Sequence, residues 1–271
     1  DRRRELARRG RERLATRTVF DSEALVVGRD AALAAHLGAP WTQEQLDEAR
    51  EEELSCADAA DLVVSVSEHD ARIYRSRSNA PVYVLGHRVD VAKPRSEPPT
   101  GARLLFIGRL AEPGSPNSLG LRWFLENVMP ALAEQVGATL DVVGLNGDWL
   151  EEFRSSRVNV LGPVEDTYPL YDRARAFIAP TFFAAGIPHK VHEAAARGLP
   201  VITTDIIARQ VGLQDGVNAR VAKSAASFTS AIEELLEDDR EWARISDGGR
   251  RIALEQCSPE RFSRSVATIL G

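Results

Sequence analysis

Hydrophobic residues along this chain fall into short runs that alternate with longer amphipathic segments. The apolar runs predict strands, and they lie at 17–20, 61–66, 81–85, 103–108, 138–144 and 158–162. The amphipathic segments predict helices, and they include 43–59, 119–136 and 167–174. Strands that alternate with helices in this way indicate an α/β fold with parallel sheets.

Polar residues and a change in composition divide this pattern further. Thr42 is a good N-cap residue for the helix at 43–59, with Gln45 at the capping-box position, and Ser67 begins another helix. Residues 91–102 are rich in Pro, Lys and Glu and are the best candidate for a linker. We therefore expect one domain at 1–96, a second at 97–255 and a terminal helix at 256–271.

The segment from Ile178 to Thr204 predicts a strand, a glycine loop, a helix and a second strand. Gly186 allows close approach of a ligand, and exposed N–H groups at a helix start favour an anion such as a phosphate. Lys190 adds a positive charge in the first turn, and Glu193 could accept hydrogen bonds from the two hydroxyls of a ribose. The alternative interpretation is that both are ordinary exposed helix residues.

This segment resembles the donor-binding loop and helix of the retaining GT-B glycosyltransferases of the glycosyltransferase 4 group. It is similar to the bacterial variant Gly-Ala-Gly-Ile-Lys-Gly-Lys-Val-x-Glu-Ala, with which residues 184–193 align without a gap. The resemblance implies a Rossmann-like, parallel-sheet donor domain preceded by an incomplete second Rossmann-like domain. It also implies that the chain is a fragment or a truncated chain, whose missing N-terminal half is a partner.

The resemblance also implies roles for individual residues. Arg109 and Lys190 would stabilise the diphosphate and Glu193 would hold the ribose, so these three are the catalytic candidates. The other expected contacts to the donor nucleotide are Gly108, Asn117, Gly144, Leu161, Gly186, Ile187, His189 and Thr204. No metal ion or cofactor is expected.

Two positions depart from the pattern of the wider family. Its first glutamate, seven residues before the second, would fall on Ala185, and its usual lysine after the arginine is replaced by a stretch that contains Asn117. A missing cation beside the leaving diphosphate would weaken stabilisation of the transition state, for which Lys190 could compensate. Asn117 could equally be a turn or helix-start residue.

Composition and charge limit the classes of partner. With 44% hydrophobic and 27% charged residues the chain has the composition of a globular protein, and a net charge of -6 gives no support to nucleic-acid binding. The arginine-rich segment up to Arg17 could touch an anionic membrane surface or be an exposed helix. Cys56 and Cys257 are too few for a disulfide framework. We expect a cytoplasmic protein, with peripheral contact to the inner face of a membrane as an open alternative.

The function expected from the resemblance is retaining glycosyl transfer from a nucleotide-diphosphate sugar to a glycan, lipid-linked or small-molecule acceptor. Bacterial polysaccharide biosynthesis is a plausible setting for such a reaction. Because of Ala185, a noncatalytic nucleotide-binding or scaffolding module of GT-B fold stays open. A GT-B sugar-nucleotide epimerase is a further alternative.

Overall fold

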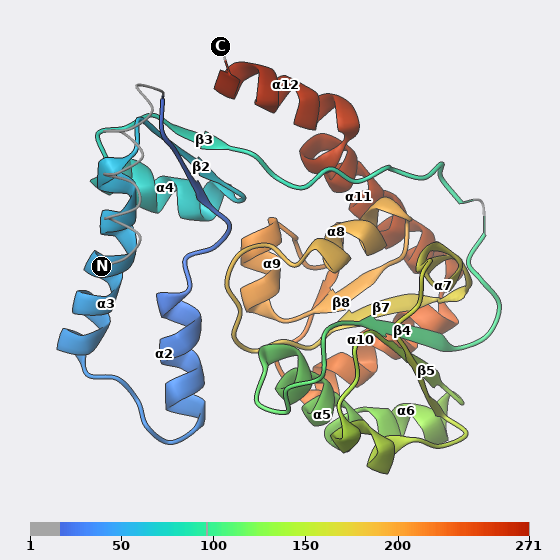
Figure 1. Ribbon diagram of the computed structural model, residues 1–271. Coiled ribbons are helices and arrows are strands. Elements are labelled where there is room, and N and C mark those ends of the chain that lie inside the picture. Colours follow the sequence, from blue (N-terminus) through green and yellow to red (C-terminus); the bar gives the residue numbers. More distant parts are fainter. Residues whose placement is uncertain (1–16, 96, 271) are drawn as a thin grey trace. The chain divides into compact units, whose positions relative to one another are not determined.

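A computed structural model describes residues 17–95 and 97–270, so the arginine-rich segment 1–16 lies outside the described residues. The chain divides into two compact units, and each is described by itself. Unit 1 comprises residues 1–87, 183–187 and 260–271, and unit 2 comprises 88–182 and 188–259. The division falls between His87 and Arg88, shortly before the expected linker. Figure 1 labels the helices and strands of both units.

Unit 1 is built on a parallel sheet in the order β1-β2-β3. Its strands are β1 (Val19–Ser22), β2 (Leu62–Ser65) and β3 (Val82–Val84), and its helices are α2 (Val27–His36), α3 (Gln43–Ser55), the 3-10 helix η1 (Cys56–Ala59) and α4 (Glu68–Arg77). Side chains of a strand alternate between the two faces of its sheet. Val63 accordingly packs with Tyr74 of α4, whereas Leu62 and Val64 pack with Ile269 of α12 (Pro259–Leu270).

The predicted helix starts in unit 1 are confirmed. The Thr42 hydroxyl accepts a hydrogen bond from the Gln45 backbone N–H at 3.2 Å, and the Gln45 side chain accepts one from the Thr42 N–H at 2.9 Å. These two bonds form the expected capping box at the start of α3. The Ser67 hydroxyl caps α4 by accepting from the N–H of Asp70 at 3.0 Å.

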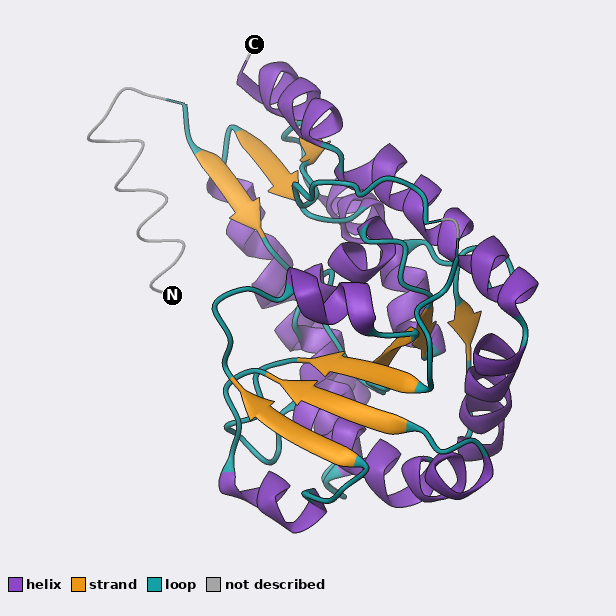
Figure 2. Cartoon of the chain, turned by 90° about the vertical axis from the view of Figure 1, so that its right-hand side faces the viewer, coloured by secondary structure: helices purple, strands orange, loops and turns teal. Residues whose placement is uncertain are grey.

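Unit 2 is built on a parallel sheet in the order β6-β5-β4-β7-β8-β9. The strands are β4 (Arg103–Ile107), β5 (Thr139–Val143), β6 (Val158–Gly162), β7 (Ala176–Ala179), β8 (Val201–Thr203) and β9 (Arg220–Val221). Neighbouring strands point the same way in Figure 2. The chain builds outward from β4 to β6 and then returns to β7, which pairs with the other edge of β4. In open parallel sheets, ligands bind outside the carboxyl ends of the strands at such a reversal of order.

Helices complete unit 2, and its core lies between them and the sheet. These helices are α5 (Pro116–Asn127), α6 (Met129–Gln135), the 3-10 helix η2 (Asp148–Phe153), α7 (Tyr168–Arg173), α8 (His189–Ala196), α9 (Asp205–Val211), α10 (Ala225–Glu237) and α11 (Asp239–Cys257). The main buried cluster joins Phe106 of β4 to Phe124 of α5 and Phe228 of α10. A parallel sheet buried in this way explains why its strands are continuous apolar runs.

Several predicted elements have different bounds in the structure. The helix expected at 119–136 is two helices, α5 and α6, because Val128 leaves the regular conformation and Pro130 has no N–H to donate. The helix expected at 43–59 ends at Ser55 and continues as the 3-10 turn η1. The first strand begins at Val19, two residues later than the apolar run that predicted it.

The segment expected to be a linker follows the surface of unit 2. The N–H of Val89 donates to the carbonyl of Cys257 at 2.8 Å, and the N–H of Ala92 donates to that of Ala196 at 2.9 Å. The guanidinium of Arg95 lies 2.7 Å from the Asp172 carboxylate. The segment is therefore fixed by backbone bonds and an ion pair. Cys257 and Cys56 are both buried free thiols, and burial raises the pKa of Cys257 to about 12.

We predict that Gly120→Ala destabilises unit 2. A Cβ at residue 120 would lie 2.2 Å from the carbonyl oxygen of Pro180, so α5 would have to move away from the chain that follows β7. Overpacking of this kind costs about 1–3 kcal/mol. Urea unfolding followed by tryptophan fluorescence measures it.

Gly114→Ala is the matched control for this substitution. It lies six residues earlier, and a Cβ there would meet nothing within 4 Å. We expect its free energy of unfolding to stay within about 0.5 kcal/mol of the native chain. Equal effects of the two substitutions would contradict the role assigned to the close contact at Gly120.

Candidate functional site

Three strands of unit 2 end in glycines at the carboxyl edge of the sheet. Gly108 follows β4 and its N–H donates to the carbonyl of Val143 at 2.9 Å. Gly144 follows β5 with a φ of 132°, and a Cβ there would lie 1.9 Å from the Gly108 carbonyl oxygen. Its N–H donates to the carbonyl of Gly162 at 3.0 Å. This edge of the sheet consequently presents backbone rather than side chains to a ligand.

Lys190 extends from the first turn of α8 to the end of β4. Its Nζ donates to the Oδ1 of Asn117, near the start of α5, at 2.7 Å. The same atom lies 4.7 Å from the centroid of the Phe106 ring, and a Cβ at Gly108 would lie 3.2 Å from it. The absence of a side chain at Gly108 therefore leaves the space that the ammonium occupies.

The surroundings of Lys190 are poor in negative charge. Burial lowers its pKa from the ordinary 10.5 to about 7. Within the described part of the chain, an amide oxygen and an aromatic ring are its polar contacts, and no carboxylate pairs with it. An anion bound here would stabilise the protonated amine.

Glu193 lies one turn further along α8 and is held by two donors. The hydroxyl of Tyr171, from α7, donates to its Oε2 at 3.0 Å, and the Nδ1 of His189 lies 3.4 Å from its Oε1. Burial and the neighbouring carboxylate raise the pKa of Tyr171, so the phenol stays protonated and acts as a donor. The bond to Glu193 is the main cause of the raised pKa of His189.

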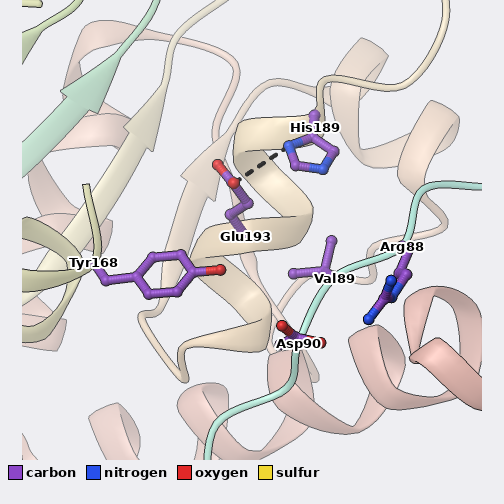
Figure 3. A pocket seen from close by; sticks show the side chains of 6 residues that line it. All are labelled: Arg88, Val89, Asp90, Tyr168, His189 and Glu193. Carbon is purple, nitrogen blue, oxygen red and sulfur yellow. Dashed lines mark ion pairs between the residues drawn. The ribbon is translucent and has the colours of Figure 1, made fainter. Parts of the chain in front are cut away.

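Glu193 and His189 line a cavity of about 270 Å³ within unit 2. Figure 3 shows their ion pair on one side and Tyr168 opposite, with its hydroxyl directed into the cavity. Arg88, Val89 and Asp90, from the segment before β4, line the remainder. The wall thus combines an aromatic ring with charges of both signs around the Glu193 carboxylate.

The other predicted residues have different surroundings. The Arg109 side chain is 71% exposed and its guanidinium lies 3.6 Å from Glu112, while its carbonyl accepts a 3.4 Å bond from the Asn117 amide. Leu161 is 42% exposed near the end of β6. The Thr204 hydroxyl is buried and donates to the carbonyl of Thr181.

Gly186 and Ile187 group with unit 1 and are described there. Gly186 has a φ of 67°, which favours glycine, and a Cβ at this position would lie 2.8 Å from the carbonyl oxygen of Glu23. Both conformation and space therefore require glycine here. Ala185, at the position of the family's first glutamate, is partly buried.

Sequence reasoning missed the aromatic residues that support the two charged side chains. Phe106 reads as a core residue of β4, and Tyr171 as an apolar position of α7. The cue for Tyr171 is that Tyr168 and Tyr171 are three residues apart, a spacing that puts both on one side of a helix. Arg88 and Asp90 also flank the candidate site without being part of a recognisable motif.

Comparisons with known proteins agree with this arrangement. A family described as "Glycosyl transferases group 1" matches residues 101–238. The fold is similar to that of Anabaena HepE in complex with UDP and glucose, with 16% identity over 98% of this chain and 75% of that chain and a TM-score of 0.71. A sucrose-phosphate synthase from Thermosynechococcus elongatus has 17% identity over 98% of this chain and 70% of its own, with a TM-score of 0.72.

S. aureus TarM, solved with fondaparinux, alpha-GlcNAc-glycerol and UDP, has 12% identity and a TM-score of 0.68 over 86% of this chain. The chain spans about half the length of TarM, 48% of that protein. Identities this low establish the fold, and they confirm the predicted α/β architecture of GT-B type. A comparison with curated proteins finds no sequence match.

Two searches of the described residues complete the site. None of the helices at 17–95 or 97–270 combines the length and apolarity needed to cross a membrane. In the same residues, no three His, Cys, Asp or Glu side chains gather closely enough to hold a metal ion.

We predict that Lys190 makes stability depend on pH in a specific window. Because its pKa in the folded chain is about 7 and its ordinary value is 10.5, the unfolded chain binds more protons between these values. The free energy of unfolding therefore gains from this residue as the pH rises from about 7 to about 10.5. Lys190→Met should remove that gain and flatten the dependence.

Urea unfolding at several pH values from 7 to 10 measures this slope. Three of the four tryptophans, Trp123, Trp149 and Trp242, lie in unit 2, so their fluorescence reports mainly on that unit. Lys93→Met, at an exposed position, is the control and should keep the native slope. Parallel curves for the native chain and Lys190→Met would contradict the prediction.

Proposed function

Because the chain belongs to the glycosyl transferases group 1 family, we propose that it moves a sugar from a nucleotide-diphosphate donor to an acceptor. We further propose retention of configuration and membership of the glycosyltransferase 4 group, on the motif that ends in Lys190 and Glu193. The observation that carries the proposal is the placement of these two side chains on one helix beside the reversal of strand order. A cation for the diphosphate and an acceptor group for the ribose lie there one helical turn apart.

The diphosphate site follows from the position of Lys190. Its amine lies over the glycine at the end of β4, where a phosphate could approach the backbone closely. Gly186 and Ile187, just before α8, would add backbone N–H donors near the start of the helix. Arg109, with an exposed guanidinium on the next loop, would supply a second charge. Protein cations would thus balance the charge of the leaving group without a bound metal.

Glu193 is suited to hold the ribose because its orientation is fixed in advance. A carboxylate offers about four positions for hydrogen bonds, and Tyr171 and His189 take one on each oxygen. The remaining positions can accept from two neighbouring ribose hydroxyls. The base would then lie along the β5 and β6 side, where Gly144 and Leu161 are placed.

A second candidate function is a nucleotide-binding module without turnover. The specific observation in its favour is Ala185, which cannot make the contact to the donor sugar expected of the family's first glutamate. Donor binding alone would agree with both candidates. Cleavage of the bond between the sugar and the diphosphate distinguishes them.

We predict that Glu193→Gln weakens UDP binding at least about tenfold. UDP is the first nucleotide to test because the HepE and TarM structures contain it. The amide can still accept from Tyr171 but loses the charge, and hydrogen bonds to charged groups are worth about 1.5–3 kcal/mol. Calorimetric titration of UDP, GDP and ADP, repeated with EDTA, measures the affinities and the independence from metal.

A UDP analogue that lacks both ribose hydroxyls separates the contact from a general loss of charge. The native chain should bind this analogue more weakly than UDP, whereas Glu193→Gln should bind both alike. Glu255→Gln, an exposed residue of α11, is the control and should match the native chain. Equal losses for UDP and the analogue in Glu193→Gln would refute the ribose assignment.

We also predict slow hydrolysis of the correct nucleotide sugar by the native chain. Proton NMR of freshly released sugar should show the anomer of the donor, because retention preserves it. Lys190→Met should lower the rate by about 10²–10³, the effect of losing one group that stabilises the developing charge. UDP binding without hydrolysis of any tested donor would favour the binding module.

A further inference from the structure

A second cavity of unit 2 is separate from the site around Lys190 and Glu193. We call it the Phe182 cavity. It has a volume of about 240 Å³ and is lined by Phe182, Thr204, Asp205, Ile206, Arg209, Ala222 and Lys223. These residues follow β7, β8 and β9, so the cavity lies at the carboxyl edge of the same sheet.

An exposed aromatic ring forms one wall of this cavity. Phe182 is 40% exposed although it is a large apolar residue. Its ring meets Trp123 edge-on, with centroids 4.7 Å apart and planes at 86°, and Trp123 in turn contacts the buried Phe228. The ring is therefore fixed from behind while part of it stays open to a ligand.

Charged groups lie around the ring. Asp205 and Arg209, one turn apart on α9, form an ion pair of 2.9 Å. Lys223 follows β9, is exposed, and makes no ion pair within the part of the chain that the structure describes. The Thr204 hydroxyl is already donated to a backbone carbonyl. The polar rim thus consists of a carboxylate, a guanidinium and an additional cation.

This combination matches the chemistry of a sugar. A sugar ring has an apolar face of C–H groups and a rim of hydroxyls, and aromatic side chains contribute binding through such apolar contacts. A few placed polar groups then fix the orientation of a ligand in its pocket. Asp205 can accept from hydroxyls, Arg209 can donate to them, and Lys223 favours a negatively charged substituent.

The strand order indicates which sugar would occupy the cavity. The proposed base contacts lie at β5 and β6, the diphosphate site lies at β4 and β7, and the Phe182 cavity lies beyond them at β8 and β9. Neighbouring strands are about 4.8 Å apart, so β8 is about 10 Å from β4 along the edge. The cavity is thus on the opposite side of the diphosphate site from the nucleoside.

We propose that the Phe182 cavity binds a sugar ring of the acceptor, stacked on Phe182, and prefers a ring that carries a carboxylate near Lys223. The assignment to the acceptor rests on the proposed glycosyl transfer. The recognition of a sugar ring rests on the cavity itself.

Ligand-observed NMR with methyl β-D-glucuronide as the probe tests this proposal. In the native chain, saturation transfer should reach the ring protons of the probe, and titration should give a dissociation constant. Phe182→Ala should weaken binding about 3- to 10-fold, the range expected for one aromatic contact. Phe182→Tyr keeps the ring and should bind like the native chain. Leu254→Ala, an exposed apolar residue of α11, is the matched control.

Lys223→Gln tests the preference for a carboxylate. It should weaken binding of the glucuronide but leave binding of methyl β-D-glucoside unchanged. No binding of the glucuronide by the native chain, or equal binding by Phe182→Ala, would overturn the proposal. An equal effect of Lys223→Gln on both glycosides would overturn the preference for the carboxylate.

Titration of the same variants with UDP separates this inference from the proposed function. Phe182→Ala should bind UDP like the native chain, because the ring lies outside the proposed nucleotide site. Normal UDP binding with glycoside binding that ignores Phe182 would refute the subsite alone. Binding of the glucuronide that depends on Phe182 in a chain that binds no nucleotide would support a sugar site and refute the donor proposal.

Discussion

The contact on which the candidate site depends is the one between the Lys190 ammonium and the Asn117 amide oxygen. It joins the first turn of α8 to the start of α5, across the place where the strand order of unit 2 reverses. An amide stabilises a cation less than a carboxylate does, and burial therefore keeps the pKa of this lysine low. The site is organised around a positive charge that the protein itself leaves incompletely compensated.

The Glu193 carboxylate is arranged in the opposite way. Tyr171 and His189 both donate to it, so its geometry is fixed before a ligand arrives. The two side chains thus divide two requirements of a binding site. Lys190 supplies affinity for an anion, and Glu193 supplies a fixed direction for hydroxyl groups.

Much of this arrangement could be predicted from the sequence. Continuous apolar runs identify buried parallel strands, and the glycines after β4, β5 and β6 mark where those strands end. The loop and helix around Gly186 and Lys190 form a local motif with a direct physical meaning. These features are local, because a few adjacent residues determine both their conformation and their chemistry.

Other features could not be predicted because they depend on residues far apart in the chain. Asn117 and Lys190 are 73 positions apart, and Tyr171 and Glu193 are 22 apart. Neither pair has a sequence pattern, since only the packing of α5 and α7 against the sheet brings the partners together. The break between α5 and α6 was missed for a local reason, because one irregular residue at Val128 interrupts an otherwise helical pattern.

The contact between Gly120 and Pro180 has a mechanical consequence. Without a side chain between them, the backbone of α5 rests directly on the chain that leaves β7, and no flexible group can absorb a displacement. A shift of that chain is therefore transmitted to α5 as a rigid body, and with it to Asn117 in the first turn. The partner of Lys190 is in this way geared to the segment that leads into the glycine loop.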